Sequence, residues 1–161
     1  MKIECTNCDY RKPFEGKKIR KIYDSLLSFL TVDAYEYRCP KCGDTEYFYG
    51  DLVKLHETIV NFLIQKEGLL SGNEIRFLRK YLDFSSETFA TLLGLDLSTI
   101  HQIEGEQEHS KTVDNFIRIL VAVSTPVRGH SIYDRIFLRK KMEDNFLISE
   151  NGEISNLSWL S

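Results

Sequence analysis

The chain has no long apolar run. Its 161 residues are 42% hydrophobic, but the longest apolar stretches are short and interrupted by charged residues. This pattern excludes a membrane-spanning helix. The first residues, MKIECTNCDYRK, also lack the apolar centre of a signal peptide. We therefore expect a soluble, cytoplasmic protein with no membrane partner.

Catalytic signatures are missing as well. The sequence contains no defensible Ser-His-Asp or Cys-His order, no phosphate loop and no metal motif with an open coordination position. With 12% aromatic residues, the composition is too rich in core-forming side chains for a disordered protein. We therefore expect a folded protein that is not an enzyme.

An excess of positive charge is also absent. The formal net charge is −3, and residues 51–125 carry seven Lys or Arg against eleven Asp or Glu. Within that segment, GLDLSTIHQIEGEQEHS (residues 94–110) contains four acidic residues and no Lys or Arg. Charge by itself therefore gives no support to a nucleic-acid partner.

Cysteine is absent after residue 42, and the four cysteines form two Cys-x-x-Cys pairs, Cys5 with Cys8 and Cys39 with Cys42. Each pair can point two thiolates at one ion from a tight turn, and two pairs make a closed tetrahedral site. Because such a site leaves no position for water, we predict one structural Zn²⁺ per chain. Iron, held as in rubredoxins of similar spacing, is an alternative. Two disulfides fit a reducing cytosol poorly.

The segment between the pairs, KKIRKIYDSLLSFLTVDAYEYRC, alternates weakly and is rich in Ile, Tyr, Val and Phe. It predicts antiparallel strands with turns near Asp24-Ser25 and near Asp33. A sheet of this size buries little area, so the metal should supply much of its folding free energy.

Helical periodicity follows. DLVKLHETIVNFLIQKEG predicts a connecting helix with Asp51 as N-cap and Gly68 as its end. SGNEIRFLRKYL begins with a capping box of Ser71 and Glu74, which predicts a helix from Gly72. Further helices are expected after the caps Ser85, Asp96 and Thr112. The inward positions expected on the connecting and last helices are Leu52, Leu55, Ile59, Phe62 and Leu63, and Val113, Phe116, Ile117 and Leu120.

The spacing across the second and third of these later helices is specific. A small residue, Ala90, falls where two helices would cross closely, and Gly94 falls where the turn needs a positive φ. Ile100 and Ile103 fall where the third helix packs back. These four places match the packing of a helix-turn-helix. An ordinary helical bundle with a chance match is the alternative.

Over residues 1–123 the chain resembles the MqsA family, in which a four-cysteine zinc domain precedes an XRE-type helix-turn-helix domain. The resemblance rests on the cysteine pairs and on LLSGNEIRFLRKYLDFSSETFATLLGLDLSTIHQIE. It implies a homodimer through the helical domain that binds a palindromic DNA operator and represses its own promoter. For antitoxin members it also implies neutralisation of a toxin encoded beside them, here a possible partner of the zinc domain.

The expected third helix offers uncharged groups for DNA contact. Gln can pair with adenine, Ser and Thr can reach bases or phosphates, and His can donate to phosphate. Cations for the phosphates are few, so binding should be weak or strongly dependent on salt. A solvated helix face is the alternative for three of these cations, and the basic residues of the zinc domain are the alternative contact surface. The candidates are Ser98, Thr99, His101 and Gln102 for bases, Arg76, Arg79, Lys80 and Lys111 for phosphates, and Lys17, Lys18, Arg20 and Lys21 as the alternative.

The fold class expected is α+β, with a small zinc-binding β domain and connecting helix over residues 1–68 and an all-α, Cro-like helix-turn-helix domain over 69–125. Residues 126–161 form a C-terminal extension with a helix and a β-hairpin in NFLISENGEISNLSWL. Its apolar residues suggest a dimer or partner surface. The expected function is that of a zinc-stabilised dimeric transcriptional regulator, an antitoxin in particular. The alternative is a protein-interaction module whose zinc domain holds a partner and whose helical domain only dimerises.

Overall fold

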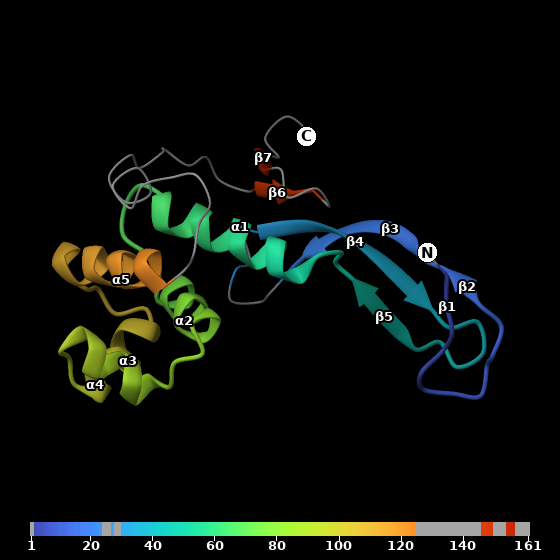
Figure 1. Ribbon diagram of the computed structural model, residues 1–161, viewed down its shortest axis with the longest axis horizontal. Coiled ribbons are helices and arrows are strands. Elements are labelled where there is room, and N and C mark those ends of the chain that lie inside the picture. The colour runs from blue at the N-terminus through green and yellow to red at the C-terminus, as the bar shows by residue number, and fades with distance from the viewer. Residues whose placement is uncertain (1, 24–26, 28–29, 125–145, 150–153, 157–161) are drawn as a thin grey trace. The chain divides into compact units, whose positions relative to one another are not determined.

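The computed structural model describes residues 2–23, 27, 30–124, 146–149 and 154–156. The described part is a mixed α+β protein with five helices and small, mainly antiparallel sheets (Figure 1). The chain divides into two compact units, Met1–Leu55 with Asp144–Ser161, and His56–Glu143. None of the described helices combines the length and apolarity that crossing a membrane requires.

Strand β4 (Leu30–Arg38) is the centre of the first unit's main sheet. One edge of β4 pairs antiparallel with β3 (Lys17–Ile22). The other edge pairs with β6 (Phe146–Ile148) near the start of β4 and with β5 (Thr45–Phe48) near its end. Strands β1 (Lys2–Ile3) and β2 (Phe14–Glu15) form a separate two-stranded sheet.

The two faces of β4 differ in burial. Leu30, Val32 and Ala34 lie on one face and are at most 2% exposed. Tyr37 lies on the other face, where its ring packs so closely on Gly16 that an added Cβ would lie 2.6 Å from it. Alternation of side chains along the strand therefore gives this unit one apolar face, and on the opposite face Tyr37 is buried against Gly16.

The turn predicted near Asp33 is wrong. Asp33 lies inside β4, opposite Arg20 of β3. Its carboxylate is 3.3 Å from the Lys18 ammonium and 3.5 Å from the Arg20 Nε, so cross-strand cations balance an acid that strands otherwise disfavour. The other predicted turn, at Asp24-Ser25, lies outside the described residues.

The predicted C-terminal hairpin is present. Strand β6 pairs antiparallel with β7 (Ile154–Asn156), and the connecting Asn-Gly lies outside the described residues. Because β6 also pairs in parallel with β4, the hairpin belongs to the first unit. The structure thus groups the chain differently from the ranges 1–68, 69–125 and 126–161. The helix expected after residue 130 is also outside the described residues.

The helices start at residues that the sequence marks. The helices are α1 (Leu52–Gln65), α2 (Gly72–Tyr81), α3 (Ser86–Leu93), α4 (Leu97–Glu104) and α5 (Lys111–Ser124). The Asp51 carboxylate accepts from the Lys54 N–H at 3.0 Å, and the capping box of Ser71 and Glu74 is complete. Ser85 caps α3, and Gly94 ends it with a φ of 65°. These predictions are confirmed.

Four details differ from the prediction. Asp96 occupies the N-cap position of α4, but its side chain makes no capping hydrogen bond. Helix α5 starts before Thr112, because the Ser110 hydroxyl accepts from the Val113 N–H at 3.2 Å. Two residues expected inside are exposed, Leu52 by 47% and Phe116 by 45%. Ile59 and Leu63 of α1 are buried as predicted, and Val60 and Ile64 are buried in addition.

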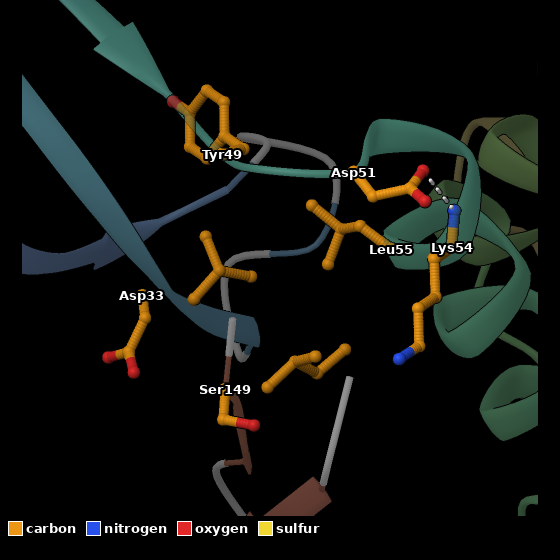
Figure 2. Close-up of a pocket in the computed structure, with 8 residues that line it drawn as sticks. Asp33, Tyr49, Asp51, Lys54, Leu55 and Ser149 are labelled. Carbon is orange, nitrogen blue, oxygen red and sulfur yellow. Dashed lines mark hydrogen bonds between the residues drawn. The ribbon is translucent and has the colours of Figure 1, made fainter. Parts of the chain in front are cut away.

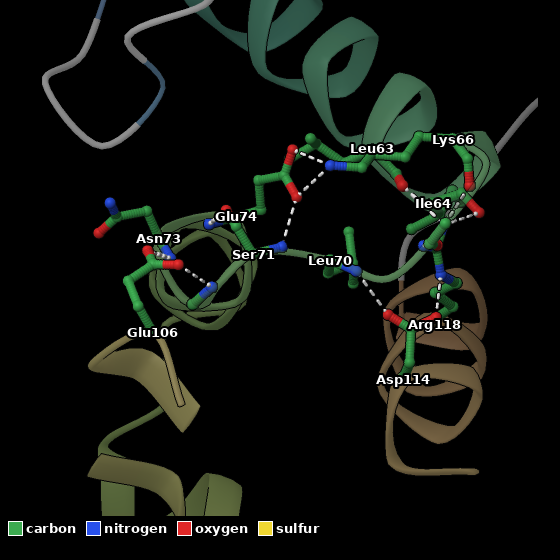
Figure 3. Close-up of polar contacts among 12 residues, drawn as sticks. Leu63, Ile64, Lys66, Leu70, Ser71, Asn73, Glu74, Glu106, Asp114 and Arg118 are labelled. Carbon is green, nitrogen blue, oxygen red and sulfur yellow. Dashed lines mark hydrogen bonds and ion pairs between the residues drawn. The ribbon is translucent and has the colours of Figure 1, made fainter. Parts of the chain in front are cut away.

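A buried ion pair joins the helices of the second unit (Figure 3). The Arg118 Nε lies 2.7 Å from the Asp114 carboxylate, and both side chains are fully buried. Asp114 also accepts the Leu70 N–H at 2.8 Å. The Arg118 guanidinium donates to carbonyls that follow or end α1, at 2.8 to 3.1 Å, because these groups have no partner within the helix. The four carbonyls belong to Leu63, Ile64, Lys66 and Gly68.

Candidate metal centre and nucleic-acid interface

The four cysteines lie together at the ends of strands. Cys5 and Cys8 follow β1, and Cys39 and Cys42 lie between β4 and β5. All four sulfurs are within 4.8 Å of one another, and the Cys5–Cys42 and Cys8–Cys39 pairs are 3.7 Å apart. Four sulfurs bound tetrahedrally at about 2.3 Å from one ion would be roughly 3.8 Å apart. The arrangement can therefore hold a metal ion.

The same distances exclude disulfides in this arrangement. A disulfide needs sulfurs about 2.05 Å apart, whereas all four cysteines here are free thiols. The second pair is set by a tight turn, in which the Gly43 N–H donates to the Cys39 carbonyl at 3.0 Å and Gly43 has a φ of 73°. Glycine suits this left-handed position, so the turn that aims Cys39 and Cys42 at one point is built into the sequence.

The thiols ionise unequally. Burial raises the pKa of Cys39, but backbone N–H groups of Cys42 and Lys41 that donate to its sulfur bring the pKa down to about 6. For Cys42 the Asp44 N–H lowers the pKa, yet burial and the neighbouring thiols raise it to about 12. The backbone N–H groups around Cys39 therefore favour its thiolate, which is the form that binds a metal ion. Sulfur geometry fits both zinc and iron.

The packing residues of α3 and α4 lie as the spacing predicts. Ala90 is 3% exposed, Ile100 is fully buried and Ile103 is 4% exposed. Gly94 between the helices has the positive φ that the turn needs. Helix α4 therefore has one face in the core and an opposite face toward solvent. That face carries Ser98, His101 and Gln102, all exposed, and the half-buried Thr99.

Two cations expected to meet phosphates are held inside the unit. The Arg79 guanidinium contacts both Glu104 oxygens, with Nε–Oε1 at 2.6 Å and Nη2–Oε2 at 2.9 Å. Arg76 donates to the Glu104 carboxylate at 3.3 Å and to its carbonyl at 3.0 Å. Lys80 and Lys111 are exposed. Of the four candidates, only these two lysines present their charge mainly to solvent.

The acidic residues after α4 have separate roles. Glu104 is 4% exposed and balances the two arginines. The Glu106 carboxylate accepts the Gly72 and Asn73 N–H groups at 3.3 and 3.1 Å, at the N-terminus of α2 (Figure 3). Anions stabilise this end of a helix. Of the four acidic residues, Glu104 alone is buried, whereas Asp96, Glu106 and Glu108 are exposed.

Sequence reasoning missed Glu104, Asp114 and Arg118 as buried residues. The sequence did contain a signal for the burial of Glu104. Ile100, Ile103 and Glu104 have the i, i+3, i+4 spacing of one helix face, and this is the buried face of α4. Arg118 follows Asp114 by four residues on the stripe of α5 that holds Ile117 and Val121. Asp114 and Arg118 are also four residues apart and opposite in charge, a spacing that lets them pair on one helix. His109, whose side chain is 5% exposed, lies 3.6 Å from Asp114.

A small pocket in the first unit carries no further chemistry (Figure 2). Asp51 is engaged as the N-cap of α1, and the Asp33 carboxylate points away from Leu55 and Ser149. The lining has neither His nor Cys and consists of Val32, Asp33, Tyr49, Asp51, Lys54, Leu55, Ile148 and Ser149. The four-cysteine cluster and the exposed face of α4 are therefore the candidate sites.

In comparisons with known proteins, no family model, no curated protein and no solved structure matches this chain.

Proposed function

We propose that this chain is a zinc-stabilised, dimeric DNA-binding transcriptional regulator in which α3 and α4 act as a helix-turn-helix. The observation that carries the proposal is the pair α3–α4 itself. The buried Ala90, Ile100 and Ile103 and the left-handed Gly94 are what close helix packing in that motif requires. The same packing leaves Gln102 exposed on the outer face of α4.

The chemistry of the exposed face suits base recognition. Gln102 can make two hydrogen bonds to adenine in the major groove, and Ser98 and Thr99 can reach bases or phosphates. His101 can donate to a phosphate. Glu104 is buried and paired with Arg76 and Arg79, so it presents little negative charge to a duplex, and the exposed Glu106 carboxylate is bound to backbone N–H groups at the N-terminus of α2. This supports DNA binding by a stretch whose composition argues against it.

The number of phosphate contacts remains small. With Arg76 and Arg79 engaged by Glu104, Lys80 and Lys111 are the cations left for the DNA backbone. Each phosphate contact adds affinity through counterion release, so one protomer should bind weakly. Two protomers on a palindrome would double the contacts, and we propose a homodimer for this reason.

A stripe on α5 supports such a dimer. Phe116, Ile119 and Val123 are 45%, 38% and 59% exposed. Their spacing of three and four residues places them on one side of the helix. An apolar stripe that is left to solvent is typical of an interface.

We assign Zn²⁺ to the four thiolates, because closed four-cysteine sites of this spacing are typical of structural zinc. The ion would cross-link the loops that flank β1 and β4, with no part in catalysis, and we propose no enzyme activity. The role of antitoxin follows from the family resemblance, with the zinc domain as the surface for a toxin encoded nearby.

One observation favours the alternative, a protein-interaction module. The Glu104 pairing withdraws two arginines that a DNA-binding helix face would otherwise offer. A gel-shift assay with the DNA upstream of the chain's own gene separates the two functions. A regulator shifts that DNA and leaves random DNA of equal length unbound at the same concentration. An interaction module shifts neither.

A further inference from the structure

Glu106, just after α4, has a backbone conformation that its residue type disfavours. Its φ is 70°, in the left-handed region, which residues other than glycine rarely adopt. The residues most tolerated there besides glycine are Asn, Asp and His, and glutamate is not among them. The preceding Gly105 could adopt the region freely, yet it has a φ of −90°. Such strain persists where surrounding contacts hold it, and it often marks a residue with a function.

The strained residue closes the C-terminal turn of α4. The Glu106 N–H donates to the Ile103 carbonyl at 3.2 Å, and the Gln107 N–H donates to the Gln102 carbonyl at 3.0 Å. These two bonds define a Schellman motif, in which the left-handed position is usually glycine. Gln102 is the candidate for base contact, so the turn that contains Glu106 binds directly to the backbone of that residue.

The side chain of Glu106 anchors this turn to the start of α2 (Figure 3). Its carboxylate accepts the Gly72 N–H at 3.3 Å and the Asn73 N–H at 3.1 Å. The first four N–H groups of a helix have no partner within it. The capping box of Ser71 and Glu74 satisfies two of these four groups in α2. The other two depend on Glu106.

The backbones of the two segments are also in close contact. A Cβ added to Gly72 would lie 2.3 Å from the Ile103 carbonyl oxygen and 2.9 Å from the Glu106 nitrogen. A carboxylate that accepts backbone N–H groups makes hydrogen bonds about twice as strong as neutral ones, and the N-terminus of a helix favours its charge. The Glu106 carboxylate therefore fixes the place of the turn against α2 and offsets the strain of its own backbone.

We propose that Glu106 is a positioning residue for DNA recognition, whose carboxylate holds the C-terminal turn of α4, and with it Gln102, in place against α2. The inference rests on the proposed function of α4 in DNA binding. It predicts an effect opposite in sign to that of charge alone. An exposed carboxylate repels phosphates, so its removal by itself would strengthen DNA binding. Loss of the anchor should weaken binding, because apparent affinity falls with the fraction of molecules whose α4 is correctly placed.

Three variants separate the turn, the anchor and the charge. Glu106→Gly suits the left-handed position and keeps the turn, but it removes the anchor. Glu106→Gln removes the charge and keeps an oxygen that can accept the two N–H groups. Glu108→Gly is the matched control, because Glu108 is an exposed acid in the same loop. A residue needed only for the shape of the turn would tolerate Glu106→Gly.

The test combines fluorescence anisotropy with amide hydrogen exchange of the full chain. Anisotropy uses the DNA upstream of the chain's own gene and random DNA of equal length, and exchange is measured without DNA. Glu106→Gly should weaken specific binding roughly 3-fold or more and speed exchange of the Gly72 and Asn73 amides. Glu106→Gln should retain most of the affinity and of the protection. Glu108→Gly should change specific affinity less than about 2-fold and leave both amides protected.

Three results would overturn the proposal: unchanged or tighter specific binding in Glu106→Gly, equal losses of binding in Glu106→Gly and Glu108→Gly, or unchanged exchange of the two amides in Glu106→Gly. If the wild type binds neither DNA, the proposed function of α4 fails, and the role of Glu106 in DNA recognition fails with it. The exchange data would then still decide separately whether Glu106 anchors the turn to α2.

Discussion

The guanidinium of Arg79 and the carboxylate of Glu104 form a two-bond ion pair between α2 and the end of α4, at 2.6 and 2.9 Å. Arg76 adds a third contact to the same carboxylate at 3.3 Å. Gly72 at the start of α2 allows the close approach, since an added Cβ would lie 2.3 Å from the Ile103 carbonyl. The position of α4 thus depends on charged residues that, in the sequence, suggested contact with DNA.

Removal of Arg79 should leave the buried Glu104 carboxylate with Arg76, at 3.3 Å, as its remaining cation. We expect Arg79→Ala to lower the free energy of unfolding of the helical unit by about 1–3 kcal/mol. Urea titration followed by circular dichroism measures the change. Lys80→Ala, an exposed neighbour on the same helix, should alter stability by less than about 0.5 kcal/mol. Similar small effects for both variants would show that the Arg79–Glu104 pair does not hold α4.

The ion pair also predicts a dependence on pH. Burial alone would raise the pKa of Glu104, but Arg79, and then Arg76, lowers it below the ordinary value. The ionised carboxylate therefore stabilises the fold above an unfolded pKa of roughly 4.3, and this contribution is lost as the pH falls through the lowered folded value. Unfolding free energies of wild type and Glu104→Gln should differ most near neutral pH and converge in acid. A constant difference down to about pH 3 would contradict this account.

Metal removal should affect the units separately. Purified protein should contain one zinc per chain and be colourless, whereas a red preparation would indicate iron. A chelator, or Cys39→Ser, should unfold the first unit and preserve the helical signal, because the two units have separate cores. Lys41→Ala lies in the same turn and keeps all four sulfurs, so it should retain the metal. Melting of both units as one transition after Cys39→Ser would refute their independence.

The stripe on α5 predicts the assembly state. Sedimentation at micromolar concentration should show a dimer for the wild type. Phe116→Asp should shift it toward monomer, because a charge would be buried in the interface. Leu92→Asp on α3 changes a residue of similar exposure, 42% against 45%, outside the stripe and should stay dimeric. A monomeric wild type, with and without DNA, would count against a palindrome-binding regulator.

Local signals in the sequence predicted most helix starts. The capping box at Ser71, the cap at Ser85 and the turn at Gly94 depend on hydrogen bonds within a few residues, and such contacts are encoded locally. The four-cysteine site could also be predicted from the sequence, because two Cys-x-x-Cys pairs indicate a metal site before the fold is known. DNA binding, zinc identity and the dimer remain predictions.

Long-range pairs were less predictable. A turn was predicted near Asp33 because aspartate is uncommon inside strands. The prediction was wrong because Asp33 pairs with Lys18 and Arg20 of the neighbouring strand, which the local sequence does not reveal. No local signal singled out Arg118, which is fully buried and donates to carbonyls at the end of α1, some fifty residues earlier. Periodicity identifies an inner stripe, but it does not say which backbone groups will need a donor there.

The measurement that tests the central claim most directly is the affinity of Gln102→Ala for the DNA upstream of its own gene and for random DNA. If α4 contacts bases, the variant should lose about 1–3 kcal/mol on the specific site and little on random DNA. Lys80→Ala should weaken both alike and reduce the salt dependence. Asp96→Asn should raise affinity for every sequence without loss of stability, since the Asp96 side chain makes no cap. If Gln102→Ala and Asp96→Asn both leave a measurable binding unchanged, α4 is not the DNA-contacting helix.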